Sequence, residues 1–143
     1  NKMIKTTLFL IGMSLFAVAV GQTKTEKKQI ESTVQKYSEA GDQHNVAKLK
    51  SVLHDNYRLV WYGGKDAPFI GDKTMFISKI ESKEWGGDKR KTTVESIEIF
   101  DGFNAVAKVI LDGEKAQMRS LYTLIKVEDG WKIVGELVNA TFK

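Results

Sequence analysis

Apolar residues recur along this chain at two spacings, and each spacing predicts one kind of secondary structure. Three stretches repeat apolar residues every three or four positions, as one face of a helix does: 23–41, 46–53 and 73–80. Asn45 and Asp72 stand directly before the second and third stretches, where such residues cap helix N-termini. The pattern therefore predicts three helices in the first part of the chain.

Strands are predicted where apolar and polar residues alternate. Residues 57–62 do so, and Gly63-Gly64 is expected to end this strand. Three Asp-Gly pairs suit tight hairpin turns in the C-terminal half. They divide it into four further strands: 92–100, 103–111, 115–127 and 131–139. The connector 81–91 is polar, and its Trp85 is expected to be exposed.

The last of these strands has one continuously apolar face. Alternation places Trp131, Ile133, Gly135 and Leu137 on that face. It places Lys132, Val134, Glu136 and Val138 on the other face. We expect the first face to meet the helices and the mixed face to meet solvent or a second subunit.

Helices followed by a meander predict an α+β domain, with three N-terminal helices packed on a curved antiparallel sheet. The 143 residues are enough for one domain with one core. The chain has no cysteine, which excludes disulfides, thiol catalysis and cysteine-bound metals. Its formal net charge is only +4, so the composition does not indicate nucleic-acid binding.

Residues 1–21 have the organisation of a secretory signal peptide, in which lysines precede an uncharged apolar stretch at 8–20. We expect cleavage before Gln22, leaving a single domain at 22–143 in the periplasm or outside the cell. No membrane span is then expected in the mature protein. The alternative is an uncleaved N-terminal anchor, although the apolar stretch is short for a hydrocarbon core of about 30 Å.

Three segments that together span most of the chain carry a family resemblance. They are VQKYSEAGDQHNVAKLKSVLHDNYRLV at 34–60, AVAKVIL at 105–111 and LIKVEDGWKIV at 124–134. They resemble the nuclear-transport-factor-2-like (NTF2-like) superfamily, and within it small exported bacterial proteins of the SnoaL-like and putative lumazine-binding groups. The resemblance implies a cystatin-like cone, in which a curved sheet wraps a pocket that the helices close. It also implies a homodimer formed through the outer sheet face.

The resemblance bears on catalysis, because ketosteroid isomerases of this superfamily use a tyrosine and two carboxyl groups. Alignment on VQKY puts Tyr37 at the tyrosine, Trp61 at the base carboxylate and Thr123 at the late-strand acid. Members of the lumazine-binding group often carry an aspartate and a lysine where this chain has Ser120 and Glu136. These departures favour a pocket without proton-transferring carboxylates.

Four residues are expected to project into the cone and contact a ligand: Tyr37, Trp61, Arg119 and Thr123. Arg119 is the most informative, since a charge beside inward apolar residues must be paired, bound to a ligand or near the mouth of the cone. The alternative is that Tyr37 and Trp61 are ordinary core residues and that Arg119 lies at an exposed strand end. The histidines, His44 and His54, lack the spacing of a metal site, so no metal is expected.

The sequence thus predicts an exported domain that binds a small, partly apolar or anionic molecule, without catalysis and without a cofactor. One alternative is an enzyme of the cyclase, dehydratase or isomerase type that uses Tyr37 with Arg119 or a histidine. A carboxylate within hydrogen-bond reach of Tyr37 favours that alternative, and Asp55, Glu95 and Glu136 are the candidates. A further alternative is a protein-interaction module, which a filled cone favours.

Overall fold

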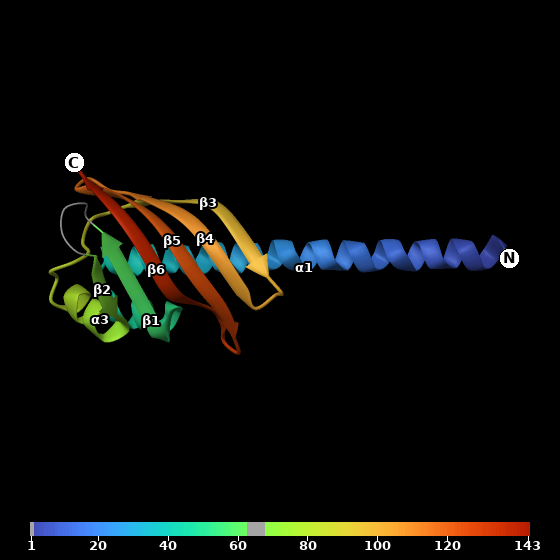
Figure 1. The fold of residues 1–143 in the computed structure, drawn as a ribbon, viewed down its shortest axis with the longest axis horizontal. Coiled ribbons are helices and arrows are strands. Elements are labelled where there is room, and N and C mark those ends of the chain that lie inside the picture. Colours follow the sequence, from blue (N-terminus) through green and yellow to red (C-terminus); the bar gives the residue numbers. More distant parts are fainter. Residues whose placement is uncertain (1, 63–67) are drawn as a thin grey trace.

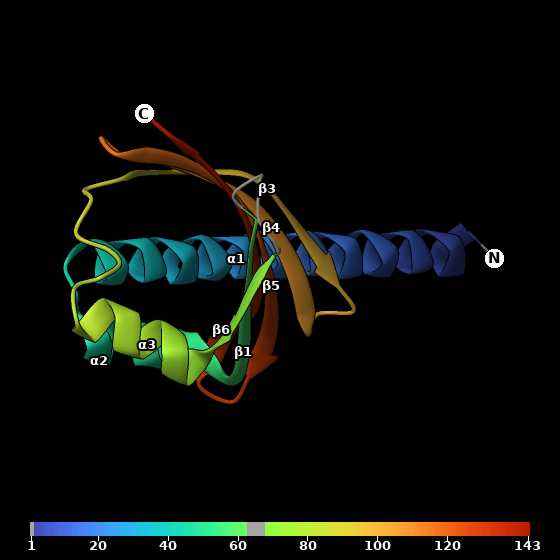
Figure 2. The same ribbon diagram turned by 60° about the vertical axis from the view of Figure 1, so that its left-hand side comes forward.

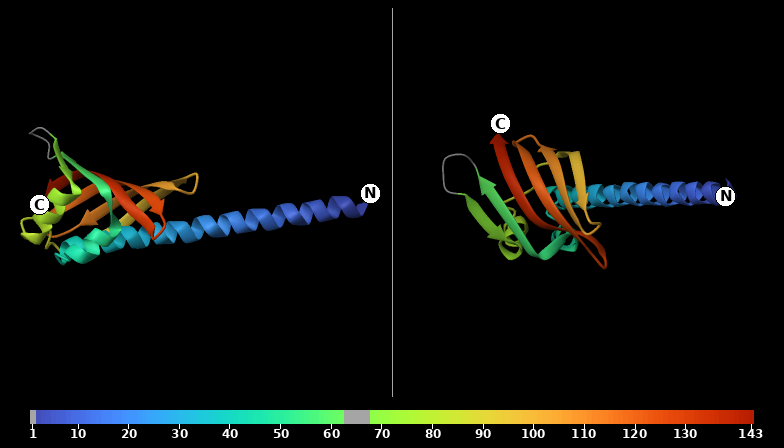
Figure 3. Two further views of the ribbon diagram at one scale, coloured as in Figure 1. Left: turned by 90° about the horizontal axis from the view of Figure 1, so that it is seen from below. Right: turned by 45° about the vertical axis from the view of Figure 1, so that its right-hand side comes forward.

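The computed structural model describes residues 2–62 and 68–143, with side chains described from Gly21 onward. The elements follow one another in the order α1, α2, β1, β2, α3, β3, β4, β5, β6 (Figure 1). One curved sheet carries the helices on its concave side (Figures 2 and 3). The predicted α+β architecture with three helices is confirmed.

The three helices are α1 (Lys2–Asp42), α2 (Val46–Val52) and α3 (Lys73–Glu81). Both predicted caps are confirmed, since the Asn45 side chain accepts from the Lys48 N–H and Asp72 accepts from the Met75 N–H. Helix α1 is longer than predicted because it continues through Thr23 without a break, and its N-terminal half projects from the domain (Figures 1 and 3). Within the described residues, no helix is both long and apolar enough to span a membrane.

Six strands form the sheet: β1 (Leu53–Tyr62), β2 (Phe69–Asp72), β3 (Lys91–Phe100), β4 (Asn104–Asp112), β5 (Ala116–Val127) and β6 (Gly130–Phe142). Their order across the sheet is β2-β1-β6-β5-β4-β3. Strands β3 to β6 make the predicted antiparallel meander. One pair differs, because β1 runs parallel to β6, so the sheet is mixed rather than wholly antiparallel. These two strands are joined by the whole intervening chain, and no tight turn forces them to be antiparallel.

The short strand β2 has no counterpart in the sequence prediction, because a strand of 4 residues is too short to show a clear alternation. It pairs with β1 and places Phe69 opposite Trp61. Gly63 and Gly64, which are predicted to end β1, lie outside the described residues.

The core fills the space between the helices and the concave face of the sheet. Helix α1 contributes Ile30, Val34 and Tyr37, of which Tyr37 is the most exposed at 5%. The sheet contributes buried side chains from β1, β5 and β6: Tyr57, Leu59, Tyr122, Leu124, Trp131 and Ile133. Each large apolar side chain buried in this way stabilises the fold by about 1.5–3 kcal/mol. Glu136 is buried with them, which is unusual for a carboxylate and marks a candidate functional site.

Candidate functional site

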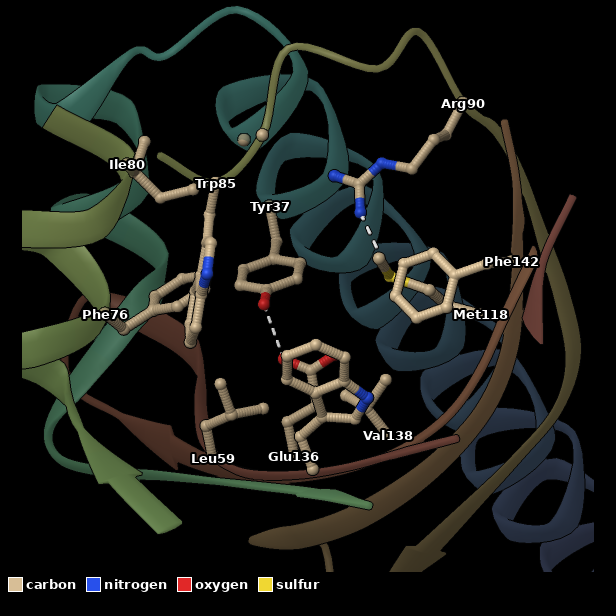
Figure 4. Close-up of a pocket in the computed structure, with 13 residues that line it drawn as sticks. Tyr37, Leu59, Phe76, Ile80, Trp85, Arg90, Met118, Glu136, Val138 and Phe142 are labelled. Carbon is tan, nitrogen blue, oxygen red and sulfur yellow. Dashed lines mark hydrogen bonds between the residues drawn. The ribbon is translucent and has the colours of Figure 1, made fainter. Parts of the chain in front are cut away.

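A cavity of about 190 Å³ lies between the helices and the concave face of the sheet (Figure 4). Five aromatic side chains line it, one each from α1, β1, α3, the α3–β3 connector and β6: Tyr37, Trp61, Phe76, Trp85 and Phe142. An apolar cavity of about 150 Å³ is large enough to hold benzene. The space therefore suits a molecule built on one ring.

Trp85 forms one wall of the cavity, so the expectation that it is exposed is wrong. Its ring centre lies 6.1 Å from that of Trp61, 6.1 Å from that of Phe76 and 5.8 Å from that of Phe69. The next residue, Gly86, has a φ of 87°, which lets the connector turn back over the cavity. A single tryptophan in a polar segment has no periodicity, so this contact could not be predicted from the sequence.

Glu136 faces the cavity and accepts a hydrogen bond from Tyr37 (Figure 4), and two further hydroxyl groups also donate to its carboxylate. Tyr37 Oη and Tyr57 Oη donate to Oε2 at 2.5 and 2.8 Å, and Ser120 Oγ donates to Oε1 at 3.1 Å. Burying a carboxylate is costly unless such partners satisfy it. The cavity therefore does contain a carboxylate within hydrogen-bond reach of Tyr37, which is the feature that favours the enzyme alternative.

A β-bulge in β6 explains why Glu136 points inward. Strand β5 pairs Leu124 with Ile133 but pairs the adjacent Thr123 with Gly135, so β6 carries one extra residue at this point. An extra residue on one strand shifts the side-chain alternation by one position. Every side chain beyond the bulge therefore lies on the face opposite to the one predicted.

The burial pattern of β6 shows that the inward and outward faces are exchanged beyond the bulge. Trp131 and Ile133 are buried before the bulge, as predicted, whereas Glu136 and Val138 are buried after it. Leu137, predicted to be inward, is 53% exposed. The two faces of β6 are thus correctly predicted up to Ile133 and exchanged beyond it.

Burial raises the pKa values of Tyr37, Tyr57 and Tyr122 well above 10.0, and the charge of Glu136 raises them further. All three are neutral hydroxyl groups at neutral pH, so Tyr37 and Tyr57 remain donors. In the part of the chain that the structure describes, the buried indole N–H of Trp61 has no hydrogen-bond partner.

Arg90 lines the opposite side of the cavity from Glu136 in Figure 4. Its Nε donates to Asp42 Oδ1 at 2.6 Å, and its backbone N–H donates to Asp42 Oδ2 at 3.0 Å. Burial opposes the charge of Arg90, but the attraction of Asp42 and its hydrogen bond outweigh that effect and raise the pKa of the guanidinium. This pair ties the connector before β3 to the end of α1.

The structure brings together only two of the four predicted site residues. Tyr37 and Trp61 line the cavity, and their contact with a ligand stays a prediction. Arg119 and Thr123 are exposed, so the expectation that they project into the cone is wrong. Strand β5 instead buries Ser120, Tyr122 and Leu124. Both faces of β5 carry apolar residues, and its sequence alone could not decide which face is inward.

The histidines lie outside the cavity lining. His44 packs against Gly87, where a Cβ atom would lie 2.7 Å from His44 Cε1. His54 Nδ1 accepts from the backbone N–H of Asn56 at 3.1 Å, and Asp55 pairs with Lys73 at 2.8 Å. Among the described residues, no group of three or more histidine or carboxylate side chains is placed to hold a metal ion.

Two residues of the site did leave a signal in the sequence. Ser120 and Glu136 are the positions at which the chain departs from the pattern of the lumazine-binding group, and the structure places them in hydrogen-bond contact. Each departure alone indicates little about the site. Their contact shows that both belong to one buried polar cluster.

The curved sheet, with helices on its concave side and a cavity between them, defines an NTF2-like domain. Solved structures with a similar fold agree with this assignment. An NTF2-like protein from Shewanella baltica has a TM-score of 0.72 at 18% identity, covering 82% of this chain and 94% of that one. An NTF2-like protein from Silicibacter pomeroyi has a TM-score of 0.74 at 16% identity, covering 83% and 98%. A ketosteroid isomerase-like protein from Erwinia carotovora atroseptica has a TM-score of 0.67 at 15% identity, covering 80% and 95%. At these identities the likeness shows the fold alone.

Residues 25–142 match the family described as "Putative lumazine-binding", and the chain belongs to this family. No curated protein matches the sequence at a significant level. The family and the fold are therefore established, and the ligand must be argued from the site.

Proposed function

We propose that this domain binds a small, largely apolar molecule in the cone and does not transform it. The observation that carries the proposal is the cavity itself. Aromatic rings line it together with one carboxylate, and that carboxylate accepts hydrogen bonds from three hydroxyl groups of the protein. Small-molecule sites are mostly apolar, with a few placed polar groups that fix orientation. Here the placed polar group is the carboxylate of Glu136, which offers an acceptor.

A pair of neighbouring substitutions on β6 tests this proposal. Val138 is buried and lines the cavity, whereas Leu137 points outward. Val138→Phe fills the cavity and should abolish binding of one-ring aromatic compounds, while Leu137→Phe should bind them as the wild type does. A ligand at about one hundred times its Kd raises the free energy of unfolding by about 2.7 kcal/mol, which a thermal-shift assay detects. Equal binding by both variants, or no stabilisation of the wild type by any compound, would contradict the proposal.

Proton-transfer catalysis is the second candidate, because Tyr37 Oη lies 2.5 Å from Glu136 Oε2. Against it, three hydroxyl groups occupy most of the roughly four lone-pair positions of a carboxylate. Exchange of carbon-bound protons α to a ketone can be followed by NMR in deuterated water. Exchange by the wild type that Glu136→Gln abolishes, with ketone binding retained, would establish catalysis and contradict the binding-only proposal.

We also propose that the protein is exported to the periplasm or beyond and that residues 1–21 are removed. The order of charged, apolar and small residues in this segment supports the proposal. The mass of the protein purified from its own cells tests it, with Gln22 as the expected first residue. A mass that includes the apolar stretch 8–20 would show an uncleaved anchor instead.

A further inference from the structure

We infer that the molecule bound in this cavity is a small organic cation, such as an amine in its ammonium form. The inference rests on the proposed binding function and names its ligand class. Among the lining residues that the structure describes, only Arg90 and Glu136 carry a charge. The ligand class follows from the state of these two charges.

The charge of Arg90 is already matched within the protein. Asp42 accepts both from its guanidinium Nε and from its backbone N–H, and the Arg90 and Asp42 side chains are only 11% and 12% exposed. Arg90 Nη2 also donates to the backbone carbonyl of Ser38 at 3.3 Å. A guanidinium held in this way has little charge left to attract an anionic ligand.

The charge of Glu136 has no such match. Its partners Tyr37, Tyr57 and Ser120 are neutral donors, which stabilise the carboxylate without cancelling its charge. In the described part of the chain, no lysine, arginine or histidine forms an ion pair with Glu136. The lining residues carry one positive and one negative charge, but because Arg90 is paired with Asp42, the uncompensated charge is the carboxylate of Glu136, which is 5% exposed. A charge in such a water-poor site attracts an opposite charge more strongly than it would in bulk water.

The walls of the cavity favour the same ligand class. Aromatic faces attract ammonium groups, and tryptophan and tyrosine do so more strongly than phenylalanine. Two of the five lining rings are tryptophans, Trp61 and Trp85, whose planes meet at 89°. These two rings pack edge to face, so they form one continuous aromatic wall. An anion would meet both these rings and Glu136 unfavourably, so the anionic ligand expected from the sequence is not part of this inference.

Three compounds of nearly equal size separate charge from shape. Benzylammonium, benzyl alcohol and benzoate each carry one ring and fit the size of the cavity, about 190 Å³. Isothermal titration calorimetry at neutral pH should give benzylammonium a Kd at least about tenfold below that of benzyl alcohol, which corresponds to about 1.4 kcal/mol. Benzoate should bind more weakly than either.

Two carboxylate-to-amide variants then assign the effect to one residue. Glu136→Gln keeps the shape of the side chain and removes its charge, so it should weaken benzylammonium about tenfold or more and weaken benzyl alcohol by clearly less. Glu95→Gln makes the same change at a surface carboxylate that pairs with Lys108 at 3.4 Å, and it should affect neither compound. Circular dichroism checks that both variants fold.

The outcomes separate this inference from the function on which it rests. Benzyl alcohol or benzoate binding as tightly as benzylammonium would overturn the cationic ligand and leave the binding function standing. Benzylammonium binding that Glu136→Gln leaves unchanged would also overturn it. Failure of all three compounds to bind would overturn both. If Glu136→Gln does not fold, the order of the three affinities in the wild type decides the question.

Discussion

Three hydroxyl groups converge on the carboxylate of Glu136, and two of them come from tyrosines that the core holds in place. Tyr37 stacks on Phe76 at 5.9 Å and meets the edge of Tyr122 at 5.4 Å. Ring contacts of this kind fix the direction of each hydroxyl before any ligand binds. The cluster therefore contributes to stability as well as to the chemistry of the cavity.

Removal of one hydroxyl from the cluster should be measurable as a loss of stability. Tyr57→Phe deletes the 2.8 Å hydrogen bond to Glu136 and keeps the ring. Because a hydrogen bond to a charged group contributes about 1.5–3 kcal/mol, we expect a decrease of this size in the free energy of unfolding in urea. Thr123→Val removes an exposed hydroxyl from β5 and should change stability by less than about 0.5 kcal/mol. Equal effects of the two variants would contradict the structural role of the cluster.

The buried tyrosines also predict how stability depends on pH. Folding raises the pKa values of Tyr37, Tyr57 and Tyr122, so the folded state keeps protons that the unfolded state releases near pH 10. Their contribution to the free energy of unfolding is fully present below about pH 10 and is lost as the pH rises above it. Melting temperatures measured across this range should fall as tyrosinate absorbance appears. Ionisation of all the tyrosines without unfolding would show that these three are not buried.

At the scale of elements, one β-bulge decides which chemistry the cavity contains. The extra residue between Ile133 and Gly135 moves Glu136 to the inner face and Leu137 to the outer face. The caps of α2 and α3 and the antiparallel meander were predictable, because local residue chemistry determines them. The bulge was not predictable, because it depends on how β6 pairs with both β5 and β1. The alternation of apolar and polar residues within one strand does not show how that strand pairs with its neighbours. Tyr37 and Trp61 could be placed in the cavity from the sequence, whereas Glu136 was one of three candidate carboxylates among which the sequence could not choose.

The connector that carries Trp85 depends on a close approach between two glycines. Gly86 has a φ of 87°, and a Cβ atom there would collide with the carbonyl oxygen of Gly41 on α1. We expect Gly86→Ala to lower the free energy of unfolding by about 1–3 kcal/mol and to weaken ligand binding, because the connector must move. Gly102 has a similar φ of 74°, but a Cβ atom there meets nothing within 4 Å.

Gly102→Ala is therefore the matched control for Gly86→Ala. It introduces the same backbone strain without the collision and lies in the turn between β3 and β4, away from the cavity. It should cost less stability than Gly86→Ala and leave ligand binding unchanged. Denaturation curves and binding curves of the two variants give the comparison. If Gly102→Ala costs as much as Gly86→Ala, the contact with Gly41 has no special role.

At the scale of the whole molecule, the outer face of the sheet carries a row of apolar residues. Leu121, Leu137, Val60 and Ile70 lie opposite one another in register across β5, β6, β1 and β2. Leu137 and Ile70 are 53% and 67% exposed. Exposed apolar patches of this kind often mark interfaces, which supports the proposal of a homodimer through this face.

A charge in the middle of this row should prevent such a dimer. Leu137→Lys places an ammonium group against its own copy at a two-fold interface, where like charges repel. We expect a dimer for the wild type and a monomer for the variant in sedimentation equilibrium, with an unchanged melting temperature at low protein concentration. A monomeric wild type would contradict the proposed homodimer, and a dimeric variant would show that the interface lies elsewhere.

A crystal structure of the protein with benzylammonium would show directly whether Glu136 binds a cation in the cavity. We expect the ring to lie among Tyr37, Trp61 and Trp85, with the ammonium nitrogen within about 3 Å of a Glu136 carboxylate oxygen. A Glu136 side chain on the outer face of β6, or a ligand bound away from Glu136, would show that this site does not bind a cation.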